Sequence, residues 1–388
     1  MKKYTVILAL LILFGVFVTQ KDWIFRMDKV PLGPNNKNLA EELGYAADAK
    51  LLVVNSDDSC AHPSFTEGLF KAMESGLVKS TSVIVHDRND DDLIRMAEAA
   101  KQHPELGVGI HLALTNEYQH NHPWKPVLSK DIVPTLYNDQ GLSWASIAEV
   151  EKNVNPEHAA MEFEAQIQKA LRLGIQLTHI DSHMGTIYSD SYFPGAPKNG
   201  LRLAAIKVAE KYQLPLTMNM FDKKLQPDLE YLDRHHILRP DTFFGFYELE
   251  DINRHLSYEG SFIQQGLTRW FVKALFGLTL PYHNTENLEE DIEVRMEINK
   301  QAIMNLIEPG LNHFYMHVAV PVAENGLAIP DGLNHKPGLD KVVRLGDMAV
   351  WTSEEMKQFL VEEDVKLINY TDIREIQRRR QSLFQTKK

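Results

Sequence analysis

Two adjacent aspartates and two distant histidines are the side chains in this sequence best suited to bind a metal ion. Asp57 and Asp58, His111 and His183 each end or follow a short apolar run. One carboxylate and two imidazoles form a ligand set for a divalent ion. The second carboxylate beside them is available to act as a base, so the combination indicates metal-assisted hydrolysis.

The adjacent aspartates pose a geometric question, because neighbouring side chains on a strand point to opposite faces. Where a strand ends the backbone turns, so Asp57 and Asp58 can both reach one cavity. One would then bind the ion, and the other would take a proton from a water whose pKa the ion lowers toward about 7. Taken alone, the pair is also typical of a cap for the helix that begins near Ser64.

The histidine pattern favours the metal site over that alternative. His111 follows Gly107 and Gly109, which allow close approach of the backbone. His183 comes two residues after Asp181, which is suited to orient a ligand imidazole. A lone histidine on an apolar strand is more typical of the core, but coordinated signals at three strand ends indicate ligands.

A further histidine, His317, lies within the segment 314–318. An imidazole there is suited to protonate a leaving amine or alkoxide. A core histidine explains the same pattern equally well, and the residues alone leave both interpretations open.

The composition is that of an ordinary globular protein. The chain has 388 residues, of which 44% are hydrophobic and 24% charged, enough for one large α/β domain or two smaller ones. Its formal net charge of -12 argues against binding to nucleic acid, which needs a basic surface. The single cysteine, Cys60, excludes an intrachain disulfide. No Gly-x-Ser-x-Gly elbow is present, which disfavours a serine hydrolase.

The N-terminus has the pattern of an export segment. Lys2 and Lys3 precede an apolar stretch at residues 5–18, which is short for a membrane span of about 20 residues. Residues 1–20 are expected to be a signal peptide or an N-terminal anchor. The anchor stays open because the residues around a cleavage site are bulky, and it would attach the protein to a membrane. The protein is expected to be exported, whether periplasmic, secreted or anchored.

Strand and helix signals alternate along the rest of the chain. Residues 21–48 are expected to be a polar connector and residues 49–388 the folded domain. Strands are expected at residues 51–55, 80–85, 107–114, 177–181, 214–218, 313–320 and 365–370, and helices at 63–75, 90–103, 156–173, 199–212, 286–307 and 353–361.

This order predicts an α/β protein with mostly parallel strands, folded as a distorted (β/α) barrel of seven or eight units. The aromatic-rich residues 221–285 are expected to be an insertion, in which core packing is favoured over contact with a substrate. In such barrels the carboxyl ends of the strands carry the chemistry, and the candidate metal ligands fall at those ends.

Two helix details are also predicted from local patterns. Ser64 and Glu67 have the spacing of a capping box at the start of the helix at 63–75. In the helix at 156–173, Met161, Ile167 and Leu171 are expected to face the core.

Several motifs, in order, resemble the YdjC-like carbohydrate deacetylases, which include the chitooligosaccharide deacetylases. The similarity runs from about Lys50 to Tyr370, apart from residues 221–285. The motifs are VNSDD at 54–58, EGL at 67–69, GLVKSTS at 76–82, GVGIHLALT at 107–115 and THIDSH at 178–183.

This resemblance implies a role for each candidate residue. It implies that Asp57 is the catalytic base, that Asp58, His111 and His183 bind the metal, and that His317 is a general acid. The implied reaction is hydrolysis of an N-acetyl group from an amino-sugar oligosaccharide or polysaccharide, with release of acetate. One divalent ion is expected, and zinc and magnesium are the first candidates. Two imidazoles and a carboxylate also suit cobalt, nickel or manganese.

The sequence departs from the family pattern at several points. Ser59-Cys60 stand where relatives often have Phe-Gly, and Val318-Ala319 follow His317 in place of Pro-Gly. These changes keep two alternatives open. One is a glycan-binding protein that has the fold but no catalysis, and the other is an esterase or amidase acting on a non-sugar acyl group.

Overall fold

The computed structural model describes residues 36–187, 200–218, 226–245, 287–333 and 337–385. The predicted export segment at 1–20 lies outside these residues, as do the start of the predicted connector and most of the predicted insertion. Among the described residues, no helix has the length and apolar character needed to cross a membrane.

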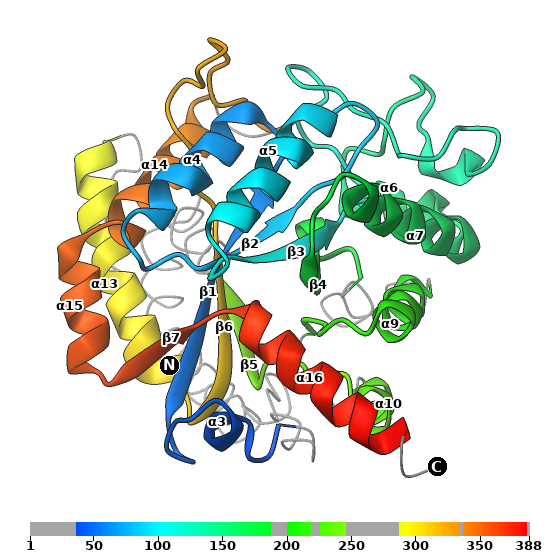
Figure 1. Ribbon diagram of the computed structural model, residues 1–388. Helices are drawn as coiled ribbons and strands as arrows, with labels where there is room; N and C mark the ends of the chain where they lie inside the picture. The colour runs from blue at the N-terminus through cyan, green and yellow to red at the C-terminus, as the bar shows by residue number, and fades with distance from the viewer. Residues whose placement is uncertain (1–35, 188–199, 219–225, 246–286, 334–336, 386–388) are drawn as a thin grey trace, which may run out of the picture.

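The described residues contain one sheet of parallel strands (Figure 1). Its order is β4-β3-β2-β1-β6-β5, and β7 pairs with β1. The strands are β1 (Lys50–Ser59), β2 (Ser80–Val83), β3 (Gly107–Leu112), β4 (Leu177–Ser182), β5 (Thr242–Gly245), β6 (Gly310–Met316) and β7 (Val365–Ile368).

Helices flank the sheet, with α13, α14 and α15 on one side of it in Figure 1 and α6, α7 and α9 on the other. All six predicted helices are present among the described residues, whereas α3, α6, α10 and α14 were not predicted. The helices are α3 (Leu39–Glu42), α4 (Pro63–Met73), α5 (Asp90–Gln102), α6 (Ile147–Asn153), α7 (Pro156–Arg172), α9 (Leu201–Tyr212), α10 (Gln226–Arg234), α13 (Leu288–Leu306), α14 (Leu339–Trp351), α15 (Glu354–Glu362) and α16 (Tyr370–Gln385), with short 3-10 turns η1 (Pro134–Leu136) and η2 (His183–Gly185).

The two ends of the sheet approach each other without a regular pairing. Ile180 of β4 bridges Leu216, whose amide donates to the carbonyl of Leu238 (3.0 Å), just before β5. The strand predicted at 214–218 is therefore reduced to a single bridge, because Pro215 has no N–H to donate to a ladder. The sheet is a curled half-barrel, which confirms the predicted distorted (β/α) barrel.

The core lies on both faces of β1. Leu52 and Val54 belong to the main apolar cluster, while Leu51 and Val53 pack with Leu39 of α3 in a second one. The described part of the segment predicted as a polar connector thus includes α3, with Leu39 and Ala40 buried. Its short helix buries apolar side chains against the sheet, and propensity alone does not reveal such tertiary contacts.

Two local predictions were wrong. The cap of α4 is His62, whose side chain accepts from the amide of Ser64 (3.2 Å), so Ser64 is already inside the helix. In α7, Met161 is 44% and Leu171 42% exposed, whereas Ile167 is buried as predicted. The buried face of α7 instead includes polar side chains, so an apolar pattern alone misassigns it.

Candidate metal centre

A β-bulge in β1 brings both aspartates close to the same imidazole nitrogen, Nε2 of His111. The register between β1 and β2 shifts between Ser56 and Ser59, and Asp58 has a φ of 65°. This left-handed conformation is unfavourable for a residue other than glycine, and such strain is concentrated at functional sites. Because the bulge interrupts the regular alternation of the strand, the neighbouring side chains of Asp57 and Asp58 can both reach His111. The alternative that the aspartates cap a helix is wrong, because His62 caps α4.

The three predicted metal ligands lie together at the carboxyl ends of their strands. Asp58 Oδ1 is 3.4 Å from His111 Nε2 and 3.0 Å from His183 Nδ1. One ligand atom from each residue lies within 4.8 Å of the others, and all three side chains are buried. A second group, Asp57, His111 and Asp181, also meets this criterion and shares His111 with the first.

The donors in this cluster fit a divalent cation. Asp58 Oδ1 is buried and faces two imidazole nitrogens, His183 Nδ1 at 3.0 Å and His111 Nε2 at 3.4 Å. A cation held between these three atoms would be bound by the carboxylate oxygen and by a lone pair of each imidazole. Two imidazoles and one carboxylate are the donor set that zinc and related ions take in catalytic sites.

The imidazole of His111 is held by a polar network inside the barrel. Its Nδ1 lies 2.7 Å from Asp181 Oδ1 and 3.2 Å from Ser82 Oγ, which leaves Nε2 directed at the cluster. Asn55 Nδ2 donates both to Asp57 Oδ1 (2.6 Å) and to Asp181 Oδ2 (3.2 Å). Asp181 therefore occupies the orienting position that the sequence predicts.

Sequence reasoning missed a buried arginine at this site. Arg344 of α14 donates through Nη2 to Asp58 Oδ2 (2.6 Å) and to the hydroxyl of Tyr118 (2.8 Å). Its guanidinium also lies 3.6 Å from the centroid of the Phe65 ring. The two oxygens of Asp58 thus have different environments, one facing the imidazoles and one held by a permanent cation.

His317 stands at the edge of the cluster, directly after β6. Its Nε2 is 3.7 Å from Asp58 Oδ2, and its backbone amide donates to Asp347 Oδ2 (2.8 Å). Asp347, also on α14, accepts from Arg295 Nη1 (2.8 Å). Burial lowers the pKa of His317 to about 3, so its imidazole is neutral at neutral pH.

Burial and neighbouring charges shift the pKa values of the two aspartates in opposite directions. Burial raises the pKa of Asp57 to about 8, against the opposing charge of His111. Burial also tends to raise the pKa of Asp58, but the positive charges of His183 and Arg344 outweigh this effect and hold that pKa well below its usual range. Asp58 is therefore an anion suited to a cation, and Asp57 gains or loses its proton near neutral pH.

Burial lowers the pKa of each ligand imidazole, but nearby carboxylates outweigh it. Glu117 and Asp58 raise the pKa of His183 to about 9. Asp181 is the strongest of the carboxylates that raise the pKa of His111 well above its usual value. Both imidazoles therefore carry a second proton at neutral pH when no ion is bound.

Metal binding is expected to release protons and to tighten as the pH rises toward about 9. An imidazole binds an ion only through a free lone pair, so His183, with a pKa of about 9, must lose a proton at pH 7. Affinity is therefore lost as the pH falls below that pKa. Calorimetric titration with zinc in buffers of different ionisation enthalpy counts the protons. Zero release at pH 7, with the same affinity at pH 6 and 8, would contradict this.

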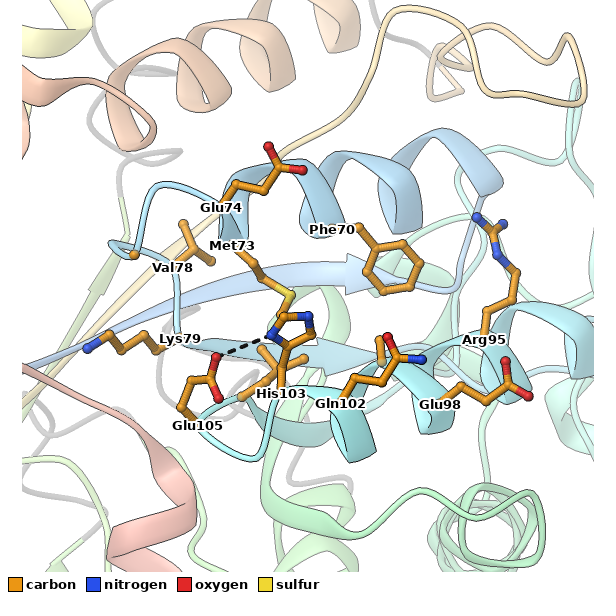
Figure 2. Close-up of a pocket in the computed structure, with 13 residues that line it drawn as sticks. Phe70, Met73, Glu74, Val78, Lys79, Arg95, Glu98, Gln102, His103 and Glu105 are labelled. Carbon is orange, nitrogen blue, oxygen red and sulfur yellow. Dashed lines mark hydrogen bonds and ion pairs between the residues drawn. The ribbon is translucent and has the colours of Figure 1, made fainter.

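A separate cavity lies between α4 and α5 (Figure 2). Its volume is about 820 Å³, and it is lined by apolar side chains such as Phe70 and Met73 and by charges of both signs, including Arg95. Figure 2 shows His103 beside Glu105, with 3.3 Å between Nδ1 and Oε1. None of the lining residues belongs to the metal-ligand groups.

A barrel of parallel strands with carboxylates and imidazoles gathered at their carboxyl ends is typical of metal-dependent enzymes. The model of the YdjC-like protein family matches residues 51–362 of this chain. The chain therefore belongs to the YdjC-like family, as the sequence motifs predict.

Two curated relatives bear the name carbohydrate deacetylase. One, from Enterococcus faecalis, is 32% identical over 167 residues, which are 43% of this chain and 58% of the relative. The other, from Thermoanaerobacter pseudethanolicus, is 28% identical over 175 residues, covering 45% of this chain and 63% of the relative. The chain thus spans little more than half the length of the relatives it matches.

A solved structure shares the fold. It is described as a cellobiose-phosphate cleavage protein from Enterococcus faecalis, and the match covers 84% of this chain and 99% of that one. The TM-score is 0.55 at 22% sequence identity. This likeness concerns the architecture of the barrel alone.

Proposed function

We propose that this protein is a metal-dependent hydrolase that removes N-acetyl groups from an amino-sugar oligosaccharide or polysaccharide. The observation that carries the proposal is the buried cluster of Asp58, His111 and His183 with Asp57 beside it. The relatives named carbohydrate deacetylase support the substrate class.

The proposed ligands of the ion are Asp58 through Oδ1, His111 through Nε2 and His183 through Nδ1. A divalent ion held there would lower the pKa of a bound water and polarise an acyl carbonyl. Zinc and magnesium are the first candidates. Arg344 keeps Asp58 ionised by holding its second oxygen, so the ligand needs no proton removed before it can bind.

Asp57 is the proposed base that takes the proton from the attacking water. Asn55 holds its Oδ1 at 2.6 Å, while Oδ2 faces the cluster at 4.0 Å from His111 Nε2. A base with a pKa near the working pH removes a proton and releases it again efficiently.

His317 is the proposed general acid for the departing amine nitrogen. Because its pKa is about 3, the imidazole must first receive a proton before it can donate one. Asp347 fixes the backbone of His317 at the edge of the cluster.

Removal of the ion is expected to abolish release of acetate from N-acetylglucosamine oligomers by the full-length chain, and zinc or magnesium is expected to restore it. Chelation followed by addition of each ion, with acetate measured by a coupled assay, tests this. Acetate release that persists after complete chelation contradicts the proposal.

The same assay separates the alternatives. Release from an acyl ester or a non-sugar amide, but not from acetylated sugars, would favour the esterase or amidase. Binding of the sugar without turnover, whichever metal ion is added, would favour a glycan-binding protein.

We also propose that residues 1–20 direct export of the chain. The basic residues followed by the apolar stretch at 5–18 support this. Fractionation of cells that express the full chain tests it, and recovery of the whole pool in the cytoplasm would contradict it.

A further inference from the structure

A carboxylate that the sequence analysis did not single out contacts one of the ligand imidazoles from behind. Glu117 Oε2 lies 2.9 Å from His183 Nε2, and both side chains are buried. The other nitrogen of the same ring, Nδ1, lies 3.0 Å from Asp58 Oδ1. The imidazole of His183 is therefore held between two carboxylates, one on each nitrogen.

Glu117 is held in place by contacts that do not involve His183. The amide of Asn116 donates to the carbonyl of Trp144 (2.6 Å), and Asn116 Oδ1 accepts from the amide of Tyr118 (2.8 Å). The carbonyl of Glu117 itself accepts from the amide of Leu333 (2.6 Å). The carboxylate is thus presented to His183 by a fixed backbone.

His183 needs such a support more than His111 does. His111 lies inside β3, where it pairs with Asp181 of β4, and the preceding residue, Ile110, also pairs with Val83 of β2. His183 lies beyond β4 in the 3-10 turn η2, and the next residue, Met184, has a φ of 51°. The sheet therefore fixes the backbone of His111, whereas the backbone of His183 lies outside the sheet and its ring depends on side-chain contacts.

We propose that Glu117 is a positioning residue that fixes His183 as a metal ligand through Nδ1. By accepting the Nε2 proton, Glu117 selects the tautomer whose Nδ1 lone pair faces Asp58 Oδ1 and the ion. Asp181 does the same for His111 from the opposite nitrogen, Nδ1, so that Nε2 is left for the ion. This inference rests on the metal centre of the proposed function, but not on the acetylated substrate.

The test is the affinity of the full chain for cobalt and zinc, measured by calorimetry on wild type and Glu117→Gln. We expect the substitution to weaken binding by about 10–100-fold, as loss of such outer carboxylates usually does. We also expect the visible absorption bands of the cobalt-loaded protein to shift, because the ring of His183 is no longer held in one orientation. A purely structural role of Glu117 would not change this spectrum.

Glu162→Gln is the matched control. Glu162 is buried, and its oxygens accept from the amides of Val127 (2.8 Å) and Leu128 (3.0 Å) in the same connection, between β3 and α6, that carries Glu117. It touches no metal-ligand candidate in these bonds. We expect the control to lower the thermal unfolding temperature and to leave the cobalt affinity and spectrum unchanged.

Wild-type affinity and an unchanged cobalt spectrum in Glu117→Gln would overturn the inference. So would an equal loss of affinity in Glu162→Gln, since the effect would then come from the connection as a whole. Wild-type affinity in His183→Ala would also overturn it, because His183 would not be a ligand. Glu117→Asp, which withdraws the carboxylate by one methylene, is expected to lose affinity and serves as a second variant if Glu117→Gln does not fold.

None of these measurements requires turnover. If the metal affinities behave as expected but no acetate is released, the deacetylase proposal fails and the role of Glu117 stands.

Discussion

The Asp57→Asn variant is expected to bind the metal as wild type does and to lose about 10²–10⁴-fold of its deacetylase turnover. The amide has the shape of the carboxylate, and its Oδ1 can still accept the hydrogen bond that Asn55 Nδ2 gives to Asp57 (2.6 Å). It has no basic oxygen, so it cannot take a proton from water. Turnover and zinc affinity are measured on the same preparation.

The matched control is Asp58→Asn, the neighbouring residue with the same change of charge. Because Asp58 is a proposed ligand, this variant is expected to lose metal affinity together with turnover. Normal deacetylation by Asp57→Asn would show that Asp57 is not the base. A loss of metal affinity in Asp57→Asn equal to that in Asp58→Asn would instead make Asp57 a ligand, as the second group of convergent side chains allows.

The Asp57→Asn substitution is also expected to change the stability of the metal-free protein. The pKa of Asp57 is raised to about 8 in the folded chain, above its value in an unfolded chain. The stability that this shift contributes is complete in acid and is lost as the pH rises through about 8. Asp57→Asn is therefore expected to gain stability over wild type with rising pH, which thermal unfolding in chelator measures.

Arg344→Met is expected to destabilise the metal-free protein by about 3–5 kcal/mol, because it leaves Asp58 buried without its permanent cation. Methionine replaces the aliphatic part of the side chain, so the loss comes mainly from the charge and its bonds to Asp58 and Tyr118. A bound divalent ion would neutralise Asp58 from its other oxygen. Zinc is therefore expected to recover a large part of the loss, beyond its stabilisation of wild type.

Arg295→Met is the control for this effect. Arg295 is also buried and pairs with Asp291 (2.9 Å) and Asp347 (2.8 Å), neither of which belongs to a metal-ligand group. Its loss is expected to destabilise the protein with or without zinc. Urea unfolding of both variants, each with zinc and with chelator, gives the comparison. Equal recovery of the two by zinc would contradict the link between Arg344 and Asp58.

The strand ends of the barrel could be predicted because their signals are local. Leu51–Val54 is a continuous apolar run, and the parallel βαβ order places the carboxyl ends of all strands at one edge. The meeting of Asp58, His111 and His183 follows from that geometry. The orienting position of Asp181 follows from its place two residues before His183.

The residues that were missed depend on contacts between distant segments. Glu117 lies in the long connection after β3, where no periodic pattern marks it. The helix α14 has Asp340, Arg344 and Asp347 on its buried face, so its apolar periodicity is interrupted and the helix was not predicted. These charges are buried only because each finds a partner elsewhere in the fold, as Arg344 does in Asp58.

The sequence by itself determined the parallel barrel and which imidazoles and carboxylates reach its strand ends, because strand periodicity and connection order are local properties. The tertiary structure alone decided how these groups are oriented and charged. The bulge at Asp58, the contact of Glu117 with His183 and the pairing of Arg344 with Asp58 each join segments far apart in the chain. Hydrogen bonds and pKa values in a buried cluster depend on such neighbours, and no local pattern encodes them.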